Sequence, residues 1–140
     1  MRIKLILLAT VIMFHHSNAA EVAPVDVSPS QKYLCTTTAE FVLEQIKNAN
    51  KLGGPFPAKA VTWSSSNIEV VLISHSTTCG NLGCSAFISF FQGEGCKSKP
   101  IQGVEPSQPL IFSSSAVNTI NRSGCSSWQL QGDKIIRSGC

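Results

Sequence analysis

Charged side chains and histidine are both scarce in this sequence. Asp, Glu, Lys and Arg together make up 14% of the 140 residues, against roughly a quarter in typical soluble domains. Because no basic run is present, nucleic acid and anionic membranes have no electrostatic support as partners. A phosphate-binding loop is also absent, and we expect no cofactor.

The longest apolar run lies at the start of the chain. Arg2 and Lys4 precede a mostly apolar stretch over 5–14, and the triplet SNA at 17–19 places small residues at positions −3 and −1 of a cleavage site. This layout is typical of a secretory signal peptide, and the run is too short to span a bilayer. We therefore expect residues 1–19 to be removed, which leaves an exported chain without a stable membrane anchor.

Removal of that segment changes the balance of charge and of histidine. The mature chain would keep 121 of the 140 residues, with 9 of the 11 basic side chains beside 8 acidic ones. A chain of this length suits one domain with its own core. We assign residues 20–27 to a flexible lead-in and 28–140 to a single domain. His75 is then the only histidine, whereas all six cysteines remain.

Six cysteines in an exported chain indicate three disulfides. In CSSWQLQGDKIIRSGC, a two-residue loop at Gly132-Asp133 makes a hairpin in which Cys125 faces Cys140. Residues directly opposite each other in a hairpin lie within disulfide reach. This hairpin therefore predicts a disulfide between its two ends.

A second hairpin is predicted around a turn at Asn81-Leu82. Its register places Cys79 opposite Cys84. If the same register continues outward, Ile73 faces Phe90 and His75 faces Ile88. By elimination Cys35 pairs with Cys96, although the sequence leaves open an exchange of partners among Cys35, Cys96, Cys125 and Cys140.

Zinc is the main alternative for the cysteines near His75. Structural zinc sites usually combine two close ligand pairs, and the segment His75…Cys79…Cys84 offers neither a second histidine nor a C-x-x-C knuckle. We therefore expect no metal site and favour disulfides.

The N-terminal part of the domain is predicted to be helical. Ser28 is expected to be the N-cap, with Pro29 at the first helical position and Gln31 completing a capping box. The helix should extend to about Asn50 and end before the GGP sequence at 53–55.

The remainder of the chain is predicted to form strands. We expect a long loop over 97–109, which contains three prolines. Strands are expected at 59–63, 68–74, 85–91 and 110–112, before the C-terminal hairpin. This order predicts an α+β fold in which one N-terminal helix packs on a small antiparallel β-sheet of hairpins, stabilised by disulfides.

The hairpin of strands 68–74 and 85–91 is expected to be apolar on both faces. One face would carry Val70, Leu72, Phe87 and Phe91. The opposite face would carry Val71, Ile73, Ile88 and Phe90. Because the single helix can cover only one face, the other face must be covered by loops, by the C-terminal hairpin or by another chain. A homo-oligomer that forms through the hairpin of strands 68–74 and 85–91 is one possibility.

Few residues suggest chemistry. His75 is the natural candidate for a general base, but no local motif marks a nucleophilic serine beside it, so we favour a structural, hydrogen-bonded histidine. Trp128 and Arg137 face each other across the C-terminal hairpin. They are candidates for a cation–π pair at a protein interface, although we prefer Trp128 packed under the helix with Arg137 covering its edge.

Two cysteine motifs carry a resemblance. C-G-x-x-G-C at 79–84 and C-x-x-W-x-x-x-G at 125–132 are similar to motifs of small exported bacterial domains of undefined role. The resemblance implies a bacterial envelope location. It does not imply any particular activity. We expect a protein that is secreted or resides in a bacterial periplasm.

Scarce titratable groups and several disulfides favour a non-catalytic protein that binds another protein, such as an inhibitor, an immunity factor or an accessory subunit. The two alternatives are a small extracellular hydrolase that uses His75 and a structural component of an envelope assembly.

Overall fold

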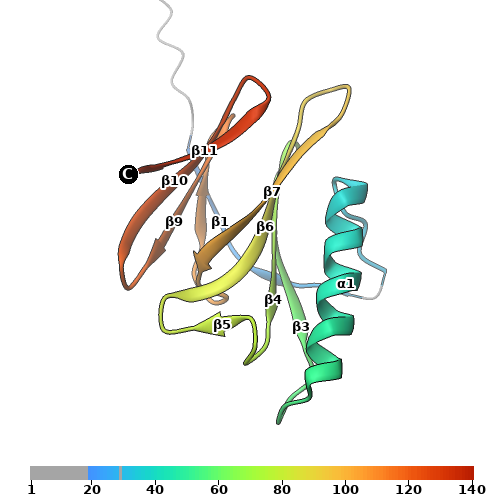
Figure 1. Cartoon of the computed structure of the whole chain (residues 1–140). Coiled ribbons are helices and arrows are strands. Elements are labelled where there is room, and N and C mark those ends of the chain that lie inside the picture. The colour runs from blue at the N-terminus through green and yellow to red at the C-terminus, as the bar shows by residue number, and fades with distance from the viewer. Residues whose placement is uncertain (1–18, 29) are drawn as a thin grey trace, which may run out of the picture.

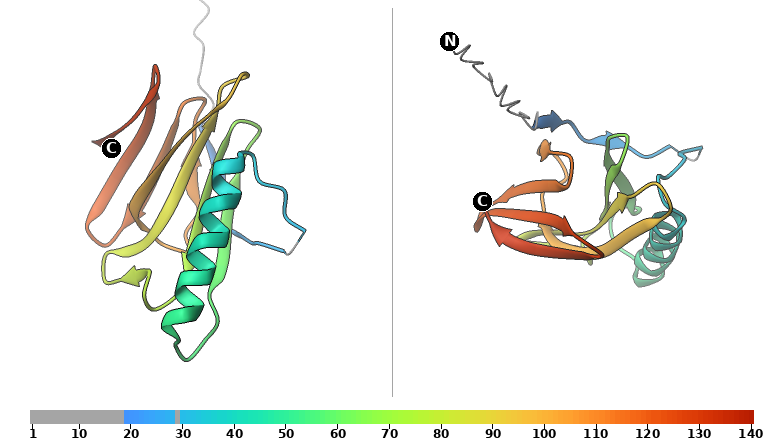
Figure 2. Two further views of the ribbon diagram at one scale, coloured as in Figure 1. Left: turned by 45° about the vertical axis from the view of Figure 1, so that its right-hand side comes forward. Right: turned by 90° about the horizontal axis from the view of Figure 1, so that it is seen from above.

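The computed structural model describes residues 19–28 and 30–140. In this part of the chain, one helix and eleven strands form three layers, with the helix on one face of a six-stranded sheet and a five-stranded sheet on the other (Figures 1 and 2). All strand pairs are antiparallel. The α+β prediction is confirmed, with a second sheet that we did not expect.

The elements have the following bounds. The helix is α1 (Thr36–Leu52). The six-stranded sheet contains β2 (Val25–Asp26), β3 (Lys59–Ser64), β4 (Ile68–Ser74), β5 (Cys79–Gly80), β6 (Gly83–Phe91) and β7 (Cys96–Val104). The five-stranded sheet contains β1 (Ala20–Val22), β8 (Leu110–Phe112), β9 (Ala116–Asn121), β10 (Gly124–Gln131) and β11 (Lys134–Gly139).

The helix begins later than the capping signals predict. Pro29 lies outside the described residues, but 30–34 are described and are not helical, so the predicted start at Ser28 is wrong. The backbone amide of Val27 donates to Ala60 of β3, and that of Leu34 donates to the carboxylate of Glu69. These contacts hold the segment extended along the sheet, so tertiary hydrogen bonds override the local capping box.

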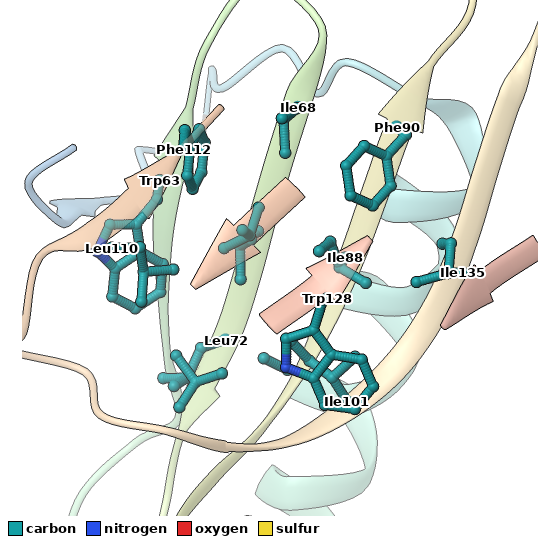
Figure 3. Close-up of a cluster of buried hydrophobic side chains, with 14 of the residues drawn as sticks. Trp63, Ile68, Leu72, Ile88, Phe90, Ile101, Leu110, Phe112, Trp128 and Ile135 are labelled. Atoms are coloured by element: carbon teal, nitrogen blue, oxygen red, sulfur yellow. The ribbon is translucent and has the colours of Figure 1, made fainter. Parts of the chain in front are cut away.

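The main core lies between the two sheets. Trp63 and Ile88 come from the six-stranded sheet, Trp128 comes from the five-stranded sheet, and all three point into the same space (Figure 3). A smaller cluster under α1 contains Val42, Val71 and other side chains. The central strand β4 is buried on both faces, as expected, and the second sheet supplies the cover that the helix does not.

The register between β4 and β6 differs from the prediction. Phe90 lies opposite Ile68 rather than Ile73, a shift of five residues, and His75 has no partner on β6. A tight turn at 75–78, in which the Thr78 and Cys79 amides donate to the His75 carbonyl, separates β4 from β5. Because the shift is an odd number, Ile88 and Phe90 share a face with Val70 and Leu72, so the predicted facing is wrong.

Two further segments differ from their predictions. Residues 97–104 of the predicted loop are not a loop: together with Cys96 they form β7, which pairs with β6. Residues 20–27, expected to be a flexible lead-in, contribute β1 and β2, which pair with β8 and β3. The lead-in therefore bridges the two sheets. The expected signal peptide lies outside the described residues except for Ala19.

Candidate functional site

Three disulfides fasten separate parts of the fold. Cys35–Cys96 joins the start of α1 to β7, Cys79–Cys84 closes the β5–β6 hairpin, and Cys125–Cys140 joins the ends of β10 and β11. These pairs coincide with those expected from the sequence. Because all six sulfurs are bonded in pairs, no cysteine thiolate is available to a metal ion. Three disulfides indicate an oxidising, extracytoplasmic location.

The Trp128 side chain belongs to the core between the sheets. It is 6% exposed. We expected it to pack under the helix, but it packs in the core between the two sheets. The guanidinium carbon of Arg137 lies 5.6 Å from the centroid of its ring, a cation–π distance. Arg137 is exposed. Of the two residues predicted as an interface, therefore, only Arg137 is open to a partner.

His75 lies at the end of β4 and is 8% exposed. Its Nδ1 is 2.8 Å from the Thr77 hydroxyl and also accepts the Thr77 amide N–H at 3.3 Å, which fixes the ring. A cavity of about 220 Å³ beside it is lined by Ser74, Ser76 and the loop that follows α1. No carboxylate is among the lining residues described there. The arrangement lacks the orienting acid of a nucleophile triad.

The loop that covers His75 projects from the molecule. We call residues 52–57, with the sequence LGGPFP, the tip loop; it contains the last residue of α1 and most of the connection to β3, and it forms the lowest point of the molecule in Figure 1. Phe56 is 76% exposed and Leu52 is 71% exposed. Pro55 and Pro57 flank Phe56 and restrict the backbone on both sides. An exposed aromatic side chain on a restricted loop is a candidate binding anchor.

A buried acid lies on the helix side of the six-stranded sheet. Glu69 of β4 is 2% exposed, and its carboxylate accepts the Leu34 amide N–H at 3.1 Å. Burial raises the pKa of Glu69, and hydrogen bonds from Leu34 and Thr38 offset part of this effect. The pKa of Tyr33 is raised as well, by its own burial and by the negative charge of Glu69.

A chain of hydroxyl groups continues from the buried acid toward the surface. The Thr38 and Ser89 oxygens lie 2.8 Å apart, Ser89 and Ser98 lie 2.9 Å apart, and Ser98 and Thr37 lie 3.0 Å apart. Every polar group in this chain thus has a partner, which is what burial requires. The arrangement fastens α1 to β6 and β7 and is structural.

Sequence reasoning missed both Phe56 and Glu69. Phe56 stands between two prolines in a segment interpreted only as the end of the helix, and the GGPFP pattern was the available signal. Glu69 interrupts an otherwise apolar strand, IEVVLI, and a charge at such a position indicates a buried partner.

The chain matches no protein-family model, no curated protein and no solved structure. In the described residues, no helix combines the length and apolar character needed to cross a membrane. Within the same residues, no group of three or more His, Cys, Asp or Glu side chains is placed to hold a metal ion.

Proposed function

We propose that this protein is an exported, non-catalytic binding protein that attaches to another protein through its tip loop. The partner presents an apolar pocket that accepts Phe56. The binding takes place in a bacterial periplasm or after secretion, and an inhibitor, an immunity factor or an accessory subunit would act in this way.

The exposure of Phe56 is the observation that carries this proposal. Phe is among the residues most often buried, and aromatic residues are enriched in the cores of protein interfaces. The neighbouring prolines reduce the number of conformations that binding must restrict, and the disulfides do the same for the body of the domain.

Other expectations have less support. In the described residues no carboxylate lines the cavity beside His75, so nothing in that cavity supports a hydrolase that uses this histidine. A homo-oligomer or an envelope assembly through the apolar hairpin was suggested by its two apolar faces, and both are covered within the chain.

The test is capture of partners with matched surface variants. Oxidised, immobilised protein would be compared with Phe56→Ser and with Leu43→Ser, because Leu43 is 72% exposed on the side of α1 and does not belong to the tip loop. We expect a protein from the envelope or secreted fraction to be retained by the wild type and by L43S and released by F56S. Retention by all three, or by none, would contradict the proposal.

A further inference from the structure

A second cavity lies where the β5–β6 turn meets β7, β9 and β11. It has a volume of about 330 Å³ and is lined by residues of that hairpin, of β7, of the β9 end and of β11. None of its lining residues belongs to the tip loop. We call it the Arg137 pocket, because Arg137 is its only charged lining residue in the described chain.

Hydrogen bonds of Asn121 connect the segments that form the wall of the Arg137 pocket. The Asn121 Nδ2 donates to the carbonyl oxygens of Gly103, at 2.8 Å, and Leu82, at 3.3 Å. Its Oδ1 accepts the Ser123 amide at 2.9 Å and the Ser123 hydroxyl at 2.6 Å. The amide of Asn121 is thus fully used in holding β7, the hairpin and the β9 end together.

Arg137 is held in place before any ligand binds. Its Nε and Nη2 both donate to the Ser126 hydroxyl, at 3.1 and 2.8 Å, and the guanidinium lies over the Trp128 ring. The hydrogen bonds that the described structure gives this group leave Nη1 for a ligand. Among the described residues that line the pocket, none is a carboxylate that would neutralise the charge of Arg137.

The remaining polar side chain of the pocket also offers a donor. The Oε1 of Gln102 accepts the Ser85 hydroxyl at 3.0 Å, which leaves its NH₂ group for a ligand. Leu82 at the rim is 63% exposed and adds an apolar surface. The pocket therefore combines a fixed positive charge, an amide donor and one apolar contact.

We propose that the Arg137 pocket binds a carboxylate carried next to an apolar side chain, as in the last residue of a peptide that ends in leucine. Arg137 supplies the charge-assisted hydrogen bond, Gln102 donates a second one, and Leu82 contacts the apolar group. The site does not depend on the tip loop, and its test is separate from that of the proposed function.

The experiment is a titration of the isotopically labelled, oxidised protein followed by amide NMR shifts. One ligand is N-acetyl-leucine and the other is a short peptide that ends in leucine, each compared with its C-terminal amide. We expect shifts around 82–84, 102–103 and 121–123 with a free carboxylate. Binding of both acids indicates that a small carboxylate suffices, and binding of the peptide alone identifies a peptide end.

Matched variants test the role of the arginine. Arg137→Gln should weaken binding on the order of tenfold, whereas Lys47→Gln, which removes an exposed charge on α1, should leave it unchanged. Gln102→Glu places a negative charge in the pocket and should weaken binding even if Arg137→Gln fails to fold. Failure of both acids to bind, equal binding of the amides, or unchanged affinity in Gln102→Glu would overturn the proposal.

Discussion

The carboxylate of Glu69, the second residue of β4, accepts the backbone N–H of Leu34 just before α1 begins. A strand at the centre of the six-stranded sheet thereby holds the start of the only helix in the described chain. The hydrogen bond gives a buried acid a structural role, and it makes the stability of the fold depend on pH.

Glu69→Gln should change that pH dependence. Because burial raises the pKa of Glu69, the folded protein holds this proton more tightly than the unfolded chain does. The stability that protonated Glu69 contributes is fully present below pH 4.5, the ordinary pKa of a glutamate. It is lost as the pH rises through the raised pKa of the folded state. The glutamine keeps an oxygen that accepts the Leu34 N–H, and it does not ionise. The variant should therefore gain stability relative to the wild type as the pH rises.

Urea unfolding from about pH 4 to about pH 8 measures this difference. Glu44→Gln is the control, because Glu44 lies on the exposed side of α1. If the stabilities of the wild type and Glu69→Gln changed in parallel with pH, the raised pKa of Glu69 would be contradicted.

The three disulfides should contribute unequally to stability. Replacing a pair by alanines should cost about 4 kcal/mol for Cys35–Cys96, about 3 for Cys125–Cys140 and about 2 for Cys79–Cys84, because the sequence separations are 61, 15 and 5 residues. The unfolding free energies of the three double variants give the order directly. If loss of the Cys79–Cys84 pair were the most damaging, chain entropy would not explain the stabilisation.

Gly83→Ala should be far more damaging than Gly80→Ala in the same hairpin. Gly83 has φ of +101°, and a Cβ there would lie 2.7 Å from the backbone carbon of Gly103. A Cβ on Gly80 would meet no atom within 4 Å. We expect a loss of about 2–4 kcal/mol for Gly83→Ala and less than about 1 kcal/mol for Gly80→Ala.

Thermal unfolding of the two glycine variants would compare them under one condition. Similar melting temperatures would mean that the close contact between the backbones of Gly83 and Gly103 is easily relaxed.

The two tryptophans should respond differently to replacement by phenylalanine. The Nε1 of Trp63 donates to the Gln108 carbonyl at 3.0 Å, whereas the Nε1 of Trp128 is buried without a partner in the described residues. Trp63→Phe should therefore lose about 1–3 kcal/mol more than Trp128→Phe. Denaturant unfolding of both variants provides the comparison, and a greater loss for Trp128→Phe would indicate that its N–H has an acceptor.

Local patterns identified several elements before their surroundings were known. Strands 68–74 and 110–112 were predicted with the observed bounds, because polar residues or proline bound their largely apolar runs. The C-terminal hairpin was predicted with its register, since the Gly132-Asp133 loop sets both the turn and the pairing.

Elements whose form depends on distant neighbours were not predicted. Strand β7 contains Pro100, which suggested a loop, yet β7 pairs only with β6 in its sheet and leaves its other edge open. Proline is tolerated at such an edge because no second strand needs its missing N–H. The predicted start of the helix was wrong for a similar reason. It depends on the contact between Leu34 and Glu69, which lie far apart in the chain.

The candidate sites divide in the same way. The disulfide partners followed from turn geometry and elimination, whereas the exposure of Phe56 and the assembly of Arg137, Gln102 and Leu82 around one cavity depend on packing between elements.

The sequence by itself determined the secondary structure whose causes are local: turn residues, apolar alternation and the spacing of cysteines. Only the tertiary structure decided that two sheets enclose the core, which face each β6 residue occupies and which polar groups meet at the surface. The physical reason is that a hairpin register or a cavity depends on contacts between segments far apart in the chain, and their free energy can exceed local preferences.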